Sequence, residues 1–226
     1  MSLRRKILLL AGFAGVSELA ADTLILYHHY QLHHTRCLPR EELPRLMLEV
    51  CDKDAVNIDC VERKIYLTSD ESKKFNLEGL ARKFFSIRAF KPELALIRWM
   101  SPNHAERESA TLESVKRHKF QPAPNTSFDE VESMYRIGPL IVDRRSEDEI
   151  LFRWKLSDTT GYNYLSIMRP EKKDKEEVDL IHVRFGSIIS HMPEEWKWIM
   201  GPTKIMHKLY SRILLATAVS NYVDEL

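Results

Sequence analysis

Apolar and polar residues alternate along most of the second half of the chain. Alternation with a period of two, broken by short polar turns, is typical of strands that bury one face. The pattern predicts four strands, over residues 137–144, 149–156, 161–168 and 178–189, and an earlier strand over residues 56–68. Because short turns join the later four, we expect consecutive strands to pair antiparallel.

Helical spacing follows the first strand. After a polar turn at residues 69–74, Asn76 can cap a helix whose apolar residues recur over residues 77–85. A second helix is predicted over residues 92–100. A charged segment with several prolines then predicts a long surface loop over residues 101–124.

The last predicted helix, residues 204–223, carries a broad apolar stripe and must pack on the sheet. We expect Leu209, Ile213 and Ala216 to face the sheet. Three basic residues spaced four apart are expected on the solvated face: Lys204, Lys208 and Arg212.

The N-terminal segment is apolar over residues 7–27, which is about the length that a membrane-spanning helix needs. Glu18 and Asp22 interrupt the apolar run, but they are four residues apart and share one helix face, near Gly15. Such a stripe can be buried against a partner protein. Three interpretations stay open: a helix that spans or lies in a membrane, a cleaved signal or transit peptide, and an amphipathic core helix.

The charge balance removes nucleic acid from the candidate partners. The chain has 34 basic and 33 acidic residues, a formal net charge of +1, so no long-range field attracts a polyanion. Neither glycine-rich phosphate-loop motif is present. His29 and His33 have the spacing of two ligands of one metal, but only Cys37 is placed to add a third. We therefore predict no metal site and no cofactor.

The element order resembles that of the START-like, or SRPBCC, helix-grip superfamily. The likeness covers residues 56–222: a strand, two helices, an antiparallel meander and a long final helix. It implies an α+β fold in which an antiparallel sheet grips the C-terminal helix. The chain then divides into a hydrophobic helix at residues 1–36, a linker at 37–55 and a helix-grip domain at 56–226.

The resemblance also implies what the domain could bind. Members of the superfamily hold an apolar cavity between sheet and helix; many bind lipids or other hydrophobic molecules, and a few are cyclases or hydrolases. Because they share no catalytic residue, none is carried over to this chain. Leu209 and Ile213 would line such a cavity. Trp196 and Trp198 would either cover its mouth or pack on the approach to the last helix.

Three functions compete. The first is a non-catalytic accessory subunit of a membrane protein assembly, which would contact the membrane or other subunits through five residues of the N-terminal helix: Leu8, Gly12, Gly15, Glu18 and Asp22. The second is a carrier of a lipid or another hydrophobic small molecule. The third is a cyclase or hydrolase of the same fold. It ranks last because the possible pair Ser187–His191 lacks a G-x-S-x-G motif, and no complete catalytic site is evident.

Two membranes fit the sequence. The mitochondrial inner membrane is favoured by arginines near the start of the chain and by the absence of acidic residues before Glu18. The endoplasmic reticulum is the alternative. It rests on a glycosylation sequon at Asn125 and on final residues, 223–226, that resemble a retention tail.

Carbonate extraction tests the membrane prediction. We expect the protein to stay in the membrane pellet after alkaline treatment, because about 20 apolar residues in a helix can anchor a chain in a bilayer. A variant that lacks residues 7–27 should move to the supernatant and serves as the control. Release of the unaltered protein would contradict the prediction.

Overall fold

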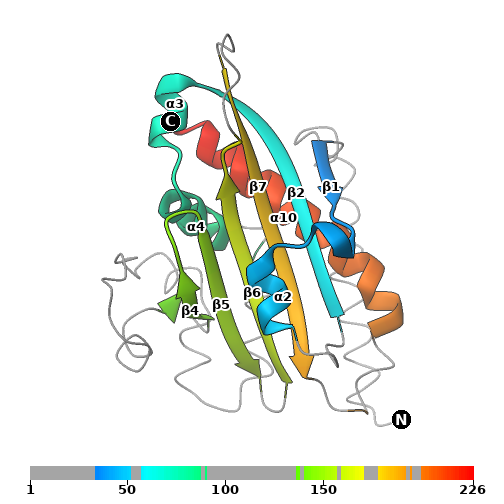
Figure 1. Cartoon of the computed structure of the whole chain (residues 1–226). Helices are drawn as coiled ribbons and strands as arrows, with labels where there is room; N and C mark the ends of the chain where they lie inside the picture. The colour runs from blue at the N-terminus through cyan, green and yellow to red at the C-terminus, as the bar shows by residue number, and fades with distance from the viewer. Residues whose placement is uncertain are drawn as a thin grey trace.

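Seven antiparallel strands form the centre of the structure, in the spatial order β1-β2-β7-β6-β5-β4-β3 (Figure 1). This computed structural model describes residues 34–51, 57–87, 90, 136–137, 140–156, 159–170, 178–191, 194 and 200–226. The strands are β1 (Thr35–Cys37), β2 (Asn57–Thr68), β3 (Arg136–Ile137), β4 (Leu140–Arg145), β5 (Glu149–Leu156), β6 (Thr159–Met168) and β7 (Val178–His191).

The alternating pattern predicted the long strands closely. β2, β5, β6 and β7 each lie within two residues of the predicted bounds, and consecutive strands from β4 to β7 pair antiparallel, as expected. The pairing that local spacing does not reveal is that of β2 with β7, from Asn57 opposite Ile189 to Thr68 opposite Val178. The first long strand therefore lies beside the last one, in the interior of the sheet.

Within the described residues, the helices are the 3-10 helix η2 (Arg40–Glu42) and the α-helices α2 (Arg45–Val50), α3 (Ser69–Lys74), α4 (Leu77–Ser86) and α10 (Met200–Val223). The fold is therefore α+β, as predicted. The helix predicted at residues 92–100 and the loop at 101–124 lie outside the described residues. No helix in the described part of the chain combines the length and the apolarity that crossing a bilayer requires.

One segment has more structure than the sequence predicted. Residues 69–74, expected as a turn, form α3, because Thr68 and Glu71 make a reciprocal capping box at its start. In the segment taken as a linker, residues 37–55, apolar residues at helical spacing predict a short helix over residues 40–50, and the structure has η2 and α2 there. α2 packs on the sheet through Met47, whose thioether lies against Gly186; a Cβ added at Gly186 would be only 2.4 Å from the Met47 sulfur.

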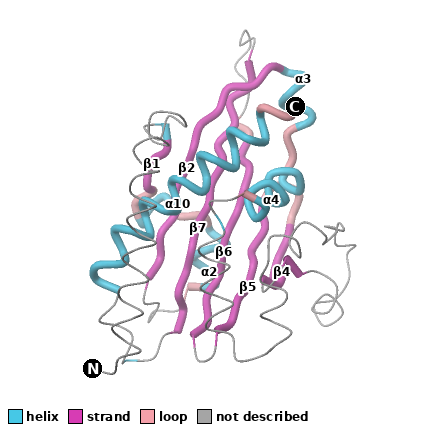
Figure 2. Tube along the Cα trace, turned by 180° about the vertical axis from the view of Figure 1, so that it is seen from behind, coloured by secondary structure: helices cyan, strands magenta, loops and turns pink. Residues whose placement is uncertain are grey.

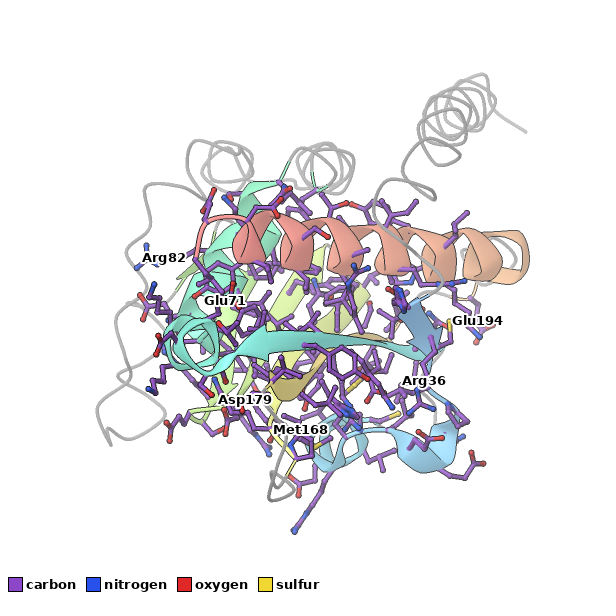
Figure 3. All side chains as sticks on the ribbon, turned by 90° about the horizontal axis from the view of Figure 1, so that it is seen from above. Arg36, Glu71, Arg82, Met168, Asp179 and Glu194 are labelled. Atoms are coloured by element: carbon purple, nitrogen blue, oxygen red, sulfur yellow. The ribbon has the colours of Figure 1, made fainter. Side chains whose placement is uncertain are left out.

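α4 and α10 cover one face of the sheet, which we call the inner face (Figure 2). α2 covers the opposite, outer face; seen from above, the sheet lies between α10 and α2 (Figure 3). The main core on the inner side includes an aromatic cluster in which Phe84 lies 4.4 Å from Phe185 and Phe85 lies 4.9 Å from Phe152, between ring centroids. This cluster joins α4 to the middle of the sheet.

α10 turns a different side to the sheet from the one predicted. Its buried residues in the main core are Leu214, Leu215, Ala218 and Val219. The three residues expected to face the sheet form a separate small cluster: Leu209, Ile213 and Ala216. At 3.6 residues per turn they lie about half a turn from the sheet-facing side. The prediction was wrong because α10 is apolar almost all round between residues 211 and 219, where only Arg212 is not fully buried.

A buried carboxylate on the outer face joins side chains of the neighbouring strands β1, β2 and β7. The side chain of Glu62 has no solvent exposure and accepts hydrogen bonds from Arg36 Nε at 3.0 Å and Arg184 Nε at 2.8 Å; His182 Nδ1 is 3.3 Å away. Burial alone raises the pKa of Glu62, but the bonds from Arg184, Arg36 and His182 outweigh burial and lower the pKa below its usual value.

Truncating a sheet-facing leucine of α10 tests the helix orientation. Leu214 is fully buried, so Leu214→Ala should lower the free energy of unfolding by about 2–5 kcal/mol. Leu48→Ala is the matched control: Leu48 is 43% exposed, and its truncation should change stability by less than about 0.5 kcal/mol. Urea unfolding measures both. Equal effects would show that α10 does not pack on the sheet through this side.

The Glu62 cluster predicts a pH-dependent stability term. Because the folded pKa of Glu62 is lowered, its contribution is present above the unfolded pKa, about 4.3, and is lost as pH falls through the folded value. Glu62→Gln should therefore cost about 3 kcal/mol at pH 7, since it leaves two arginines without their buried partner. The difference from the unaltered protein should shrink below about pH 4. A loss of stability in Glu62→Gln that is the same at every pH would contradict the proposed role of the ionised carboxylate. The control is Glu147→Gln, at an exposed position.

Candidate functional site

Polar side chains interrupt the inner face of the sheet at one end. Alternate side chains of β2 point to the inner face. Val61 and Ile65 do so and lie in the main core, and Asn57 and Asp59 point to the same side because they are an even number of residues away. Asp59 is paired with Ser187 on β7, and Ser187 with Asn163 on β6. Because directly paired residues point to the same side, these side chains form a row across three strands. We call Asn57, Asp59, Ser187 and Asn163 the inner polar row.

α10 lies over the inner polar row through its N-terminal half. His207 Nδ1 is 2.8 Å from Asp59 Oδ2, a hydrogen bond that joins the helix to β2. Ser211 follows one turn later and is 1% exposed. The same side of α10 becomes apolar at Leu214, where the main core begins. The helix thus covers polar residues with its first half and apolar residues with its second.

The inner polar row is buried without enough hydrogen-bond partners. Asn163 is 2% exposed, Asn57 3% and Asp59 5%. In the described structure five of the buried polar atoms here lack a partner: Asn57 Nδ2 and Oδ1, Asp59 Oδ1, Asn163 Nδ2 and Ser211 Oγ. Native proteins pair most buried polar atoms, and each unpaired atom costs about 1–3 kcal/mol. A concentration of such atoms in one place marks a surface that is incomplete by itself.

Apolar side chains border the row on both sides along the strands. Val61, Phe185 and Leu165 occupy the next inward positions toward the main core. On the other side, Trp154 lies against Gly161, where a Cβ would be 2.2 Å from the indole ring and 2.4 Å from a backbone oxygen. Glycine is required there because any side chain would collide with both. The polar atoms therefore form a narrow band between apolar surfaces.

The charge of the row is low. Asp59 is its single ionisable residue, and His207 is the ionisable group bonded to it. The inward-facing cation of β2, Arg63, is four residues further along, about 13 Å at the rise of a strand. Burial lowers the pKa of Arg63.

The residues that the sequence singled out are not brought together here. Trp196 and Trp198, and the N-terminal contact residues Leu8, Gly12, Gly15, Glu18 and Asp22, lie outside the described residues. Leu209 and Ile213 lie on α10, away from the main core, in their own cluster.

Of the two histidines near Ser187, only His182 has a described side chain, and it does not pair with Ser187. His182 is on the outer face beside Glu62, while Ser187 faces inward; the side chain of His191 is outside the described residues. Among the described residues, no group of three or more side chains could hold a metal ion.

Sequence reasoning missed the inner polar row, although part of the signal was present. Polar residues occupy an inward position in each of three strands: Asn57 and Asp59 in β2, Asn163 in β6 and Ser187 in β7. An alternating pattern that carries a polar residue in its apolar phase indicates a buried polar group. His207 could not be found in this way, because its position depends on how α10 is rotated on the sheet.

Comparison of the chain with protein-family models, with curated proteins and with solved structures finds no match. The function is therefore argued from the residues themselves.

Proposed function

We propose that the protein binds a small, largely apolar molecule between the sheet and α10, with a polar group of that molecule on the inner polar row. The observation that carries the proposal is the set of unpaired, buried polar atoms beneath the N-terminal half of α10. A bound polar group would supply the missing hydrogen bonds, and the apolar residues on either side would contact the rest of the molecule.

The energetics support a binding role over a purely structural one. A row kept for stability alone would gain from apolar residues of similar shape, because replacing an unsatisfied polar group in a core is neutral or stabilising. Binding sites commonly keep such costs, since the groups that destabilise the empty protein recognise the ligand. In this proposal the Asp59 carboxylate and the asparagine amides stabilise the protein with its ligand bound, at a cost to the stability of the empty protein.

Access to the row requires movement. The unpaired atoms have no contact with solvent, so a ligand reaches them only when the N-terminal half of α10 moves away from β2. The hydrogen bond between His207 and Asp59 is the described link that such movement would break. The C-terminal half of α10 is held by the main core and by Tyr222, whose ring centroid is 4.9 Å from that of Phe75. We infer that the helix pivots about this fixed end.

The strand order supports the same function. A first strand paired with the last strand of a meander, with a long C-terminal helix across one face, resembles the helix-grip layout of the START-like superfamily. Binding of hydrophobic molecules between sheet and helix is what that resemblance implies. The accessory-subunit role, with its membrane partners and its mitochondrial location, stays a prediction, because residues 7–27 lie outside the described structure.

One observation favours the enzyme alternative. Asp59 and His207 form a bonded acid–histidine pair, an arrangement that can orient an imidazole for proton transfer. Under that alternative the recovered molecule would be chemically altered by the protein. Under our proposal the molecule is released unchanged, and the mass of the molecule before and after incubation with the protein distinguishes the two.

Native mass spectrometry of gently purified protein tests the proposal. We expect a bound small molecule in the unaltered protein and its loss in Asn163→Leu, which removes a polar partner but keeps the branching and the number of heavy atoms of the side chain. The ligand-free Asn163→Leu protein should melt at the same temperature or higher, because Asn163 Nδ2 is buried without a partner.

Asn76→Leu is the matched control. Asn76 caps α4 through a 2.8 Å bond from Gly79 N to its side-chain oxygen, so this variant should lose about 0.5–2 kcal/mol of stability and keep the bound molecule. A mass spectrum of the unaltered protein that shows no bound molecule would contradict the proposal. So would a bound molecule in Asn163→Leu.

A further inference from the structure

We infer that the group held on the inner polar row is an uncharged hydroxyl, so that the ligand is an apolar alcohol rather than a fatty acid, an amine or a phospholipid head group. This inference rests on the proposed function and concerns the chemistry of that same site.

The unpaired atoms require a partner that both donates and accepts. Asp59 Oδ1 only accepts hydrogen bonds when ionised, whereas Asn163 Nδ2 only donates. Asn57 has both amide atoms unpaired, one of each kind, and Ser211 Oγ can act as either. Turning an asparagine amide over exchanges its two atoms but leaves a mixed set. A hydroxyl matches a mixed set, because it donates one bond and accepts two.

A charged group fits this set poorly. A carboxylate or phosphate has no proton to give to Asp59 Oδ1 and would bring a second negative charge beside a buried one. An ammonium group would suit Asp59, but it cannot accept from Asn163 Nδ2 or from the Asn57 amide. The one ionisable residue of the row is an acid, Asp59, so the row itself offers no cation to pair with an anion.

The width of the polar band limits how much of the ligand is polar. Apolar positions limit the row toward the main core, at Val61 and Phe185, and at the level of Asn57, where Gly161 packs against Trp154. Successive inward positions are about 7 Å apart along a strand, so the band is wide enough for one or two hydroxyls. A sugar or a phosphodiester head group would extend onto apolar surface. The ligand class is therefore an alcohol with a single small polar end.

Three probes that differ only in their polar end test the inference: decanol, decanoate and decylammonium, each titrated by native mass spectrometry into protein stripped of its bound molecule on an apolar resin. We expect decanol to bind about tenfold or more tighter than either ion. Decanoate would place an unpaired charge beside Asp59, and decylammonium would leave the donors of Asn163 and Asn57 without an acceptor; each costs more than about 1.4 kcal/mol.

Asp59→Asn sharpens the test. Asparagine can keep the hydrogen bond to His207 while removing the charge, so decanoate should bind this variant about tenfold tighter than it binds the unaltered protein. Asp148→Asn, in the exposed turn between β4 and β5, is the matched control and should leave all three affinities unchanged.

The outcomes separate the two proposals. Tightest binding of decanoate or decylammonium would overturn the hydroxyl inference and leave the binding function standing. Absence of both probe binding and a natural adduct would remove the binding function itself. If a natural adduct is present but no probe binds, the polar group of the adduct is identified by its fragment masses. A carboxylate or phosphate on the adduct overturns the inference, and an uncharged hydroxyl supports it.

Discussion

The packing of α10 across the inner face of the sheet is the contact on which the other features depend. Its C-terminal half supplies Leu214, Leu215, Ala218 and Val219 to the main core, where they meet α4 and the aromatic cluster. Its N-terminal half meets the sheet through the 2.8 Å contact between His207 and Asp59. One helix therefore closes the core at one end and covers a polar surface at the other. The two halves are held by different physical forces: apolar burial holds the C-terminal half, and a hydrogen bond to β2 holds the N-terminal half.

This division gives the structure a built-in difference in local stability. Apolar burial holds the C-terminal half of α10, and Lys74 also donates a 2.9 Å bond to the carbonyl of Leu226. The other half covers several unpaired polar atoms, which weaken the closed arrangement. Regions with few satisfied contacts open first, and ligand-binding elements commonly come from them. On the outer face, the hydrogen bond between Arg184 and Glu62 and the packing of α2 hold the strands together without contacts from α10.

Local patterns in the sequence were enough to predict the long strands, α4 and the C-terminal helix, because each has a clear period of 2 or 3.6 residues. They failed where the periodic signal was absent or ambiguous. α10 is apolar on nearly all sides, so the choice between Ile213 and Leu214 as sheet-facing residues depended on tertiary packing. The polar residues Asp59, Asn163 and Ser187 were visible in the inward phase of their strands, but only the pairing of β2 with β7 shows that they meet.

The claim that the inner polar row contacts a ligand is tested most directly by the side-chain amides themselves. In isotope-labelled protein, we expect the NMR signals of the Asn57 and Asn163 side-chain amides to shift when the bound molecule is removed. The amide of Asn76, which donates a 2.8 Å bond to Lys74 O at the exposed start of α4, should stay in place. Identical Asn57 and Asn163 signals with and without the molecule would contradict the account, because they would show that the row does not touch it.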